Sequence, residues 1–311
     1  MSDVEDKVLS DVHVGCLVGI ASSGRQVTVV SRFCIRFHQP SGKCVNEIEV
    51  DDDGDVVVSR DPSECQTVMI EHSMETTIPN VGQQVWPGAL LLADFILHNS
   101  DRFTGLSVLE LGGGTGLVSI ILARVALHVL CTDIGDDVLQ CCRRNIERNT
   151  HIYEDKPYVE GQCAQPIKVR ELNWLEHDQI ENSEGVFAWS DEDLVRLQKI
   201  DVIVAGDVVY SDGLTEAFIS TLRYLMMSYS CCSQCYIATE KRFNFTLADL
   251  DAVAPAHNHF CSCMENLCRE ESSVGRFHLE QIPLDFPSSF DFERPPLLEL
   301  WSLKFYRNLA S

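Results

Sequence analysis

The pattern of apolar and polar positions changes near residue 84. Beyond it, short apolar runs of the length of buried strands alternate with longer segments that carry a helical apolar face. We expect the strands at 107–111, 127–133, 167–172, 200–206, 236–240, 277–282 and 297–305. We expect the helices at 84–98, 115–125, 136–149, 214–227 and between 247 and 268. This alternation predicts an α/β fold with helices on both faces of a parallel sheet. The last two strands have no helix between them and are candidates for antiparallel pairing.

Residues 1–80 follow a different pattern and carry an excess of acid. Runs of β-forming residues at 26–37, 45–50 and 67–71 are typical of strands, and the run at 49–58 contains a glycine turn. The segment holds 14 acidic and 6 basic residues. We therefore predict an acidic, β-rich N-terminal extension at 1–80 and a main α/β domain at 81–311.

The composition of the 311-residue chain is that of an ordinary folded protein, with 45% hydrophobic and 23% charged residues. Disorder of the whole chain is therefore excluded. No apolar run approaches the length of a membrane span, and the acidic first residues match neither a secretory signal nor a basic presequence. We expect an intracellular monomer, in the nucleus or the cytoplasm, whose cysteines are reduced.

The net charge of −23 narrows the class of partner. Such a surface repels the phosphates of nucleic acids and attracts a lysine-rich or arginine-rich protein. In the stretch at 176–198, seven carboxylates precede the first basic residue, Arg196. We interpret this stretch as an acidic surface insertion and hypothesise that it helps to attract a basic substrate protein.

The strongest chemical motif is a glycine-rich turn after the first strand of the alternating region. Gly112, Gly114 and Gly116 permit positive φ and the close approach of a ligand, and the following helix offers free N–H groups. A dinucleotide fingerprint would need glycine at position 117, which is leucine. The glycine spacing, two residues after Glu110, is instead typical of S-adenosylmethionine sites. A carboxylate there suits an amino-acid moiety and a sulfonium charge, although a tight strand–helix turn is the structural alternative.

Polar residues at the ends of later strands point to the same site, because open parallel sheets bind ligands outside the carboxyl ends of their strands. Asp133 follows the glycines by about 20 residues, where an acid can accept both ribose hydroxyls, or it caps the next helix. Asn173 and Trp174 can bind and cover an adenine ring, or Trp174 closes the core. Asp207 and Tyr210 follow the fourth strand, and Asp207 is either a helix cap or a functional group.

In combination, these motifs resemble those of the family 16 methyltransferases. The residues that carry the resemblance are Gln84-Val85-Trp86-Pro87-Gly88-Ala89, Glu110-Leu111 with the three glycines, Thr132-Asp133, Leu172-Asn173-Trp174 and Asp207-Val208-Val209-Tyr210. The resemblance implies a Rossmann-like seven-stranded sheet, S-adenosyl-L-methionine as cofactor and S-adenosyl-L-homocysteine as product. It also implies methyl transfer to lysine in a basic substrate protein.

The resemblance further implies roles for individual residues. Asp207 and Tyr210 would line the lysine channel as catalytic residues, with Asp207 orienting the ε-ammonium group. Asn173 departs from the aspartate of many family members, but asparagine can still accept a hydrogen bond from the adenine amino group. The implied cofactor contacts are Trp86, Glu110, Gly112, Gly114, Gly116, Asp133, Asn173, Trp174 and Asp207.

Two other functions stay open on the sequence alone. One is methylation of a different acceptor, such as a protein histidine, a small molecule or RNA. The Asn/Asp-Pro-Pro-Tyr/Phe motif of amide methylation is absent, because Val208 and Val209 follow Asp207. The other is an interaction protein that binds the cofactor without chemistry, against which the intact Glu110 and Asp133 argue.

We expect no metal site. The acidic run at 51–55 lacks the glycine and glutamate positions of an EF-hand loop. The His/Cys run at 257–263, with Cys268, lacks zinc-finger spacing, so we predict a structural role for it. The cysteines at 141, 142, 232 and 235 are predicted to be buried thiols. Lys241 and Arg242 follow the fifth strand, where we favour a solvated pair over a substrate contact.

Overall fold

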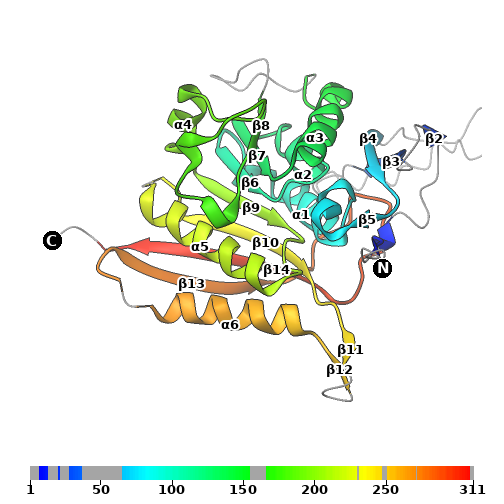
Figure 1. The fold of residues 1–311 in the computed structure, drawn as a ribbon. Coiled ribbons are helices and arrows are strands. Elements are labelled where there is room, and N and C mark those ends of the chain that lie inside the picture. The colour runs from blue at the N-terminus through cyan, green and yellow to red at the C-terminus, as the bar shows by residue number, and fades with distance from the viewer. Residues whose placement is uncertain are drawn as a thin grey trace, which may run out of the picture.

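A seven-stranded sheet forms the centre of the protein (Figure 1). The computed structural model describes residues 7–12, 20–21, 28–36, 65–154, 166–229, 231–246, 251–270 and 272–308. Five strands are parallel, and β14 is antiparallel to its neighbours β10 and β13. The predicted α/β class, the seven strands and the antiparallel pairing of the last two are confirmed. In sheet order the strands are β13 (Gly275–Ile282), β14 (Leu298–Arg307), β10 (Gln234–Glu240), β9 (Val202–Gly206), β6 (Ser107–Leu111), β7 (His128–Asp133) and β8 (Ile167–Glu171).

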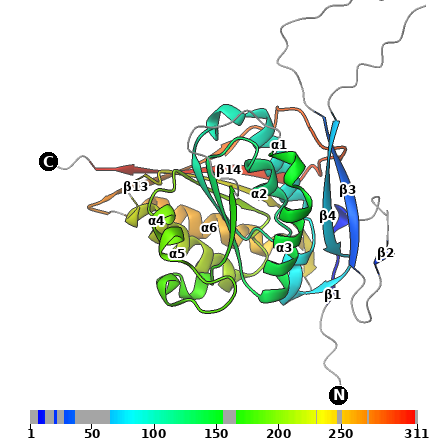
Figure 2. The same cartoon turned by 90° about the horizontal axis from the view of Figure 1, so that it is seen from above.

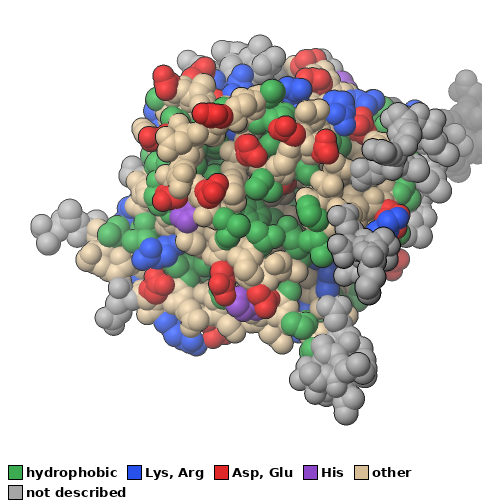
Figure 3. All heavy atoms as spheres, in the orientation of Figure 1, with side chains coloured by type: hydrophobic (Ala, Val, Ile, Leu, Met, Phe, Trp, Pro, Cys, Tyr) green, Lys and Arg blue, Asp and Glu red, His purple; other side chains and the backbone are tan. Residues whose placement is uncertain are grey.

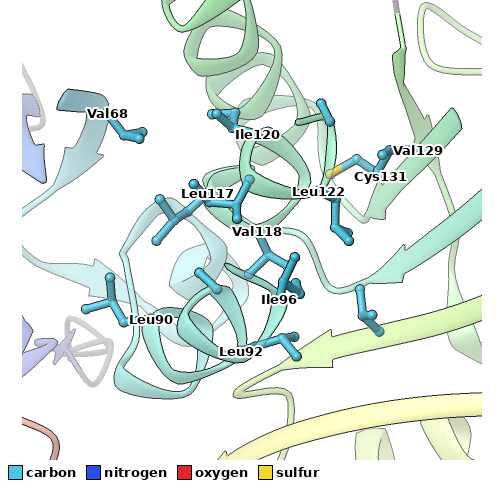
Figure 4. Close-up of a cluster of buried hydrophobic side chains, with 14 of the residues drawn as sticks. Val68, Leu90, Leu92, Ile96, Leu117, Val118, Ile120, Leu122, Val129 and Cys131 are labelled. Atoms are coloured by element: carbon cyan, nitrogen blue, oxygen red, sulfur yellow. The ribbon is translucent and has the colours of Figure 1, made fainter. Parts of the chain in front are cut away.

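Alternate side chains of the strands build a separate core on each face of the sheet (Figure 2). Val108 and Val129 pack with α1, α2 and α3, and Figure 4 shows part of this core. Leu109 and Leu130 pack with α4, α5 and α6 on the other face. Because successive side chains of a strand point to opposite faces, these uninterrupted apolar strands need helices on both. The helices are α1 (Pro87–His98), α2 (Leu117–Leu122), α3 (Asp136–Arg148), α4 (Asp191–Leu197), α5 (Asp212–Ser228) and α6 (Pro255–Arg269).

Three helices begin later than the apolar pattern predicts. α1 starts at Pro87, which fits the first helical position because its missing N–H would have no partner there. α2 starts after Gly116, whose φ of 82° is incompatible with a helix. A hairpin of β11 (Asn244–Thr246) and β12 (Asp251–Val253) precedes α6, which begins only at Pro255.

Among the described residues, no helix combines the length and apolar character that crossing a membrane requires.

Short 3-10 helices connect several elements of the fold. These 3-10 helices include η2 (Ile78–Gln83), η3 (Ser100–Arg102), η4 (Thr150–Ile152), η5 (Trp174–Glu176) and η6 (Ile180–Asn182).

The N-terminal strands form two further small sheets. β3 (Thr28–Arg36) pairs antiparallel with β4 (Cys65–Ser73) and with β2 (Ile20–Ala21), whereas β1 (Lys7–Val8) pairs with β5 (Thr76–Thr77). The strands expected at 26–37 and 67–71 are thereby confirmed. The expected strand at 45–50 and the turn at 49–58 lie outside the described residues.

Asn145 of α3 and Asn149, which directly follows this helix, bind the backbone of β4, which lies beside α3 in Figure 2. The Met69 N–H donates to Asn149 Oδ1 at 2.8 Å, and Asn149 Nδ2 donates to the Met69 carbonyl at 2.7 Å. Asn145 makes the same pair of bonds with Glu71, at 2.7 and 2.8 Å. The free edge of β4 is therefore covered by side-chain amides that imitate a neighbouring strand.

Cys34 and Cys65 form a disulfide, which contradicts the prediction that all cysteines are reduced. They are diagonal neighbours on antiparallel strands, since Cys34 lies opposite Thr67 and Cys65 opposite Arg36. Their Cα atoms are 6.1 Å apart, a separation that a disulfide can span. This proximity depends on the strand register, which a sequence separation of 31 residues does not reveal. Free and buried, as predicted, are Cys141, Cys142, Cys232 and Cys235.

The acidic stretch at 176–198 is more than a surface insertion. Phe187 and Trp189 are buried, one in each core. Ser190 and Asp193 form a capping box that starts α4, and buried Asp193 also pairs with Arg170 at 2.6 Å. The other six acids of the stretch are exposed. The surface interpretation is therefore correct for these six acids and wrong for Asp193 and the two aromatic residues.

Candidate active site

A cavity of about 670 Å³ opens at the sheet edge where β6, β7 and β9 end. Its volume is in the range of small-molecule sites, and its place is the one where open α/β sheets bind ligands. The walls come from the glycine loop after β6, the ends of β7 and β9, the 3-10 helix η2 and the segment after β10. On the face shown in Figure 3, hydrophobic side chains gather across the middle, with acidic side chains above and below them.

The glycine loop lies close to its surroundings wherever it turns. Gly112 and Gly114 have φ of 71° and 52°, in the left-handed region that favours glycine. A Cβ on Gly112 would lie 2.7 Å from Val208 Cγ1, and one on Gly114 would lie 2.8 Å from the Gly82 carbonyl oxygen. Any larger residue would push the loop away from β9 or η2. Backbone atoms of the loop, not side chains, therefore form this part of the cavity wall.

The buried carboxylate of Glu110 and the half-buried carboxylate of Asp133 flank this loop. The hydroxyl of Ser119 donates to Glu110 Oε2, and the Cys131 thiol lies 3.6 Å from the same oxygen. Burial raises the pKa of Glu110 to about 7. Asp133 accepts the N–H groups of Gly114 and Ile134, both at 2.7 Å. Burial raises the pKa of Asp133 as well, while these two N–H bonds oppose the rise.

Asp207 follows β9 with a backbone that only special residues adopt. Its φ is 60°, and it is the one non-glycine residue with positive φ in the described part of the chain. Its Oδ2 accepts the Gly88 N–H at 3.2 Å, near the start of α1. A Cβ on Gly88 would lie 2.9 Å from Asp207 Cβ, so glycine is required for this approach. Oδ1 is buried and has no hydrogen-bond partner among the described residues.

Arg242 lines the cavity, and the prediction of a solvated pair at 241–242 is wrong for it. Its guanidinium group bonds Asp207 Oδ2 at 2.8 Å and Glu240 Oε2 at 3.0 Å. It also lies 5.0 Å from the ring centroid of Trp86, a geometry that favours a cation–π interaction. Its position in the sequence could have indicated this role. Arg242 follows β10, which is parallel to β9, so the carboxyl ends of both strands lie on the same side of the sheet.

The sequence profile of a family described as lysine methyltransferase matches residues 66–265. The chain belongs to this family. Methyltransferase-like protein 22 of Mus musculus is 38% identical over 255 residues, covering 81% of this chain and 63% of the relative. The Homo sapiens protein of that name is 40% identical over 237 residues, covering 76% and 57%. The chain therefore spans about three-fifths of the length of these relatives.

More distant similarity extends to other proteins. The protein-lysine methyltransferase METTL21E of Mus musculus is 31% identical over 147 residues, covering 46% of this chain and 51% of the relative. Among solved structures, the methyltransferase domain of bacterial CtHen1-CN aligns with 12% identity and a TM-score of 0.40, covering 70% of this chain and 97% of that one. Membership of the lysine methyltransferase family rests on the profile match and confirms the resemblance that the motifs indicated.

In this family member, most of the predicted site residues meet at one cavity. Two of them do not line it. Gly116 faces α3 instead, because a Cβ on it would lie 2.9 Å from Cys142 Sγ. The absence of a side chain at this position allows α2 and α3 to approach each other. The Asn173 side chain accepts the Leu175 N–H at 3.1 Å and caps η5. The predicted residues that line the cavity are Trp86, Glu110, Gly112, Gly114, Asp133, Trp174, Asp207 and Tyr210.

Trp174 and Tyr210 both line the cavity but differ in exposure, since the Trp174 Nε1 is buried and Tyr210 is exposed. The indole ring of Trp174 packs on Phe218 at 5.2 Å between centroids, and its Nε1 is buried without a partner among the described residues. Tyr210 is 39% exposed at the cavity rim, and burial of the phenol raises its pKa to about 12. Tyr210 therefore stays a neutral hydroxyl at physiological pH.

The cavity wall formed by η2 was not predicted from the sequence. Val81 and Gly82 line the cavity, and the Val81 carbonyl accepts the Trp86 Nε1–H at 2.9 Å. Gln84 also lines the cavity, and its buried side-chain amide accepts the Ser10 N–H at 2.8 Å and donates to the Val8 carbonyl at 2.9 Å. Gln84 thus connects the N-terminal residues to the cavity.

Proposed function

We propose that the chain transfers a methyl group from S-adenosyl-L-methionine to the ε-amine of lysine in a basic substrate protein. The observation that carries this proposal is the cavity in which the glycine loop, Asp133 and Asp207 meet, at the ends of three adjacent strands. Family membership supports methyl transfer, and the similarity to METTL21E, a protein-lysine methyltransferase, supports lysine as acceptor. Within this proposal, residues 81–311 form the methyltransferase domain and residues 1–80 an acidic extension.

The residues present fit this cofactor. Each Asp133 oxygen uses one lone pair for a backbone N–H, so each can still accept a ribose hydroxyl. Trp174 Nε1 is an unused buried donor on the same wall as Gly112, whose missing Cβ leaves space beside the indole. When bound, S-adenosyl-L-methionine supplies an electrophilic methyl group on a positively charged sulfonium.

The acceptor side of the cavity offers a different chemistry. Asp207 Oδ1 is free to accept a hydrogen bond from an entering ε-amine, while Arg242 neutralises the other oxygen. Burial of an ammonium group lowers its pKa, so the lysine can release its proton on entry. Tyr210 walls the entrance. The chain's contribution is therefore to orient the amine and exclude water, which accelerates a methyl transfer without a general base.

The charge of the molecule supports a basic protein as substrate and disfavours nucleic acid. The net charge is −23, and exposed carboxylates lie above and below the apolar centre of the face in Figure 3. A monomeric state and residence in the nucleus or cytoplasm stay predictions of the sequence.

Methyl-labelled cofactor and a lysine-rich protein fraction test this function directly. After incubation with the purified chain, acid hydrolysis should release the label as methyl-lysine. Asp207→Ala should reduce incorporation at least about 100-fold, because the amine loses its acceptor. Its affinity for S-adenosyl-L-homocysteine should stay within about threefold of the parent, since the contacts from the glycine loop and Asp133 persist. Asp212→Ala, which removes an exposed acid of α5, is the matched control.

Three outcomes would count against the proposal. Label in methyl-arginine or methyl-histidine would contradict the acceptor. Cofactor binding without transfer to any fraction would favour the interaction protein. Full activity of Asp207→Ala would contradict the role of that carboxylate.

A further inference from the structure

Three side chains with metal-binding atoms meet between two helices, away from the cavity. α5 and α6 run side by side (Figure 1). His259 and Cys263 are four residues apart on α6 and therefore share one face of that helix, and Glu216 faces them from α5. One ligand atom from each lies within 4.8 Å of the other two. Among the described residues, this is the one group of three such side chains so close together.

The measured separations match those of a tetrahedral zinc site. His259 Nε2 lies 3.2 Å from Glu216 Oε1 and 3.5 Å from Cys263 Sγ. Zinc bonds are about 2.0–2.1 Å to nitrogen and oxygen and about 2.3 Å to sulfur. At tetrahedral angles these lengths require about 3.3 Å between nitrogen and oxygen and about 3.6 Å between nitrogen and sulfur. The two separations that involve His259 therefore already suit zinc. The Glu216 and Cys263 ligand atoms lie within 4.8 Å of each other, where a tetrahedral site needs about 3.6 Å.

The surroundings of this group also suit a cation. Asp212 lies one turn before Glu216 on α5, so a second carboxylate lies on the same side of that helix. The Glu216 side chain is 65% exposed and that of His259 27%, so an ion can enter from solvent and keep a water molecule as fourth ligand. Nitrogen, sulfur and oxygen ligands together favour zinc over magnesium or calcium.

A second His/Cys pair on the same helix shows what a structural pair looks like. His257 and Cys261 have the same spacing, but His257 is buried and its Nε2 bonds Glu299 Oε2 at 2.7 Å. The Cys261 sulfur lies 3.8 Å from that nitrogen. His257 is therefore paired with Glu299. Among the described residues, only the group of Glu216, His259 and Cys263 brings all three ligand atoms within 4.8 Å of one another.

We propose that Glu216, His259 and Cys263 form a zinc site that holds α5 against α6, with water in the fourth position. On binding, the Cys263 thiol releases its proton to solvent and the thiolate forms the zinc–sulfur bond. The site is independent of methyl transfer. The sequence could not reveal it, because the third ligand lies on another helix.

Cobalt(II) and zinc titrations of the reduced, chelator-treated full chain test the site. We expect one cobalt equivalent to produce a thiolate-to-cobalt charge-transfer band, and zinc to displace it. Cys263→Ser should abolish the band, and His259→Ala should weaken zinc binding at least about tenfold. Cys261→Ser, a matched thiol loss on the same helix, should change neither. Circular dichroism and melting of the metal-free variants verify folding.

Three results would overturn the site. One is the absence of a band in the parent chain. Another is a band that persists in Cys263→Ser. The third is a band that disappears in Cys261→Ser.

Discussion

At the scale of single residues, Asp207 combines a strained backbone with a buried charge. A non-glycine residue at φ 60° costs about 1–3 kcal/mol, which the surrounding structure has to offset. The Gly88 N–H and the Arg242 guanidinium both bond its Oδ2, and the Asp207 N–H bonds the Ala238 carbonyl at 2.8 Å. These contacts come from α1 and β10, so both neighbours hold the carboxylate at the cavity.

Glu110 should make stability depend on pH. Burial raises its pKa to about 7 from an ordinary 4.5, so the folded protein retains a proton that the unfolded chain releases. Stability from this group therefore falls as pH rises from about 4.5 to about 7 and is level above. Glu110→Gln keeps an acceptor for Ser119 and removes the charge. Urea denaturation should show the variant gaining roughly 2–3 kcal/mol over the parent between about pH 5 and pH 7.5.

Glu147→Gln, which changes an exposed glutamate on α3, should show no such gain. If the stability difference between Glu110→Gln and the parent does not change with pH, Glu110 is ionised in the folded state and the argument fails.

The sequence predicts correctly which residues lie at the cavity where the order of strands alone determines their position. Asp133 and Asp207 end strands whose apolar runs are unmistakable, so their positions at the cavity follow from topology. Arg242 was missed because its role depends on a contact with Asp207, which is 35 residues away in the chain. Asn173 fails to line the cavity because its side chain bonds its own η5 backbone, an interaction that a motif does not encode.

At the scale of elements, the contact between α3 and β4 should be a main source of stability. Asn149→Ala removes both hydrogen bonds to Met69 and leaves its backbone groups unpaired. We expect a loss of about 2 kcal/mol in the free energy of unfolding, measured in urea. Arg144→Met removes an ion pair with Glu71 from a half-exposed side chain and should cost less than about 1 kcal/mol. Equal losses in both variants would refute the special role of the amide.

The central strands were predictable because they are short, nearly continuous apolar runs, and the long helices because their apolar residues recur on one face. Weaker signals failed at the connections. η2 is a 3-10 helix in which only Gln83 is buried, so its sequence carries no apolar face that a pattern could reveal. The disulfide between Cys34 and Cys65 depends on the pairing register of two strands. A shift of two residues would leave the same faces buried, so hydrophobic alternation alone does not bring these two cysteines together.

At the scale of the whole molecule, the acidic stretch should act through long-range attraction. Six of its carboxylates are exposed and can be changed to amides, whereas Asp193 has to stay because it caps α4 and binds Arg170. We expect the six-fold variant to raise KM for a basic substrate at least about threefold at low salt, to weaken the salt dependence of KM and to leave kcat unchanged. The six are Glu176, Asp178, Glu181, Glu184, Asp191 and Glu192.

A second variant with amides at six exposed acids elsewhere controls for the change in net charge. These six are Asp101, Glu147, Glu154, Glu265, Glu270 and Glu280. An unchanged KM and salt dependence in the six-fold variant, or an equal effect of the control, would remove the acidic stretch from substrate attraction.

Calorimetric titration of the purified chain with S-adenosyl-L-homocysteine tests the central claim, that the turn after β6 and the acid ending β7 grip a nucleoside. We predict one binding site per chain, with affinity lowered at least about tenfold by Asp133→Ala, because two hydroxyl contacts are lost. Binding that is absent at millimolar ligand, or that Asp133→Ala leaves unchanged, would contradict the account.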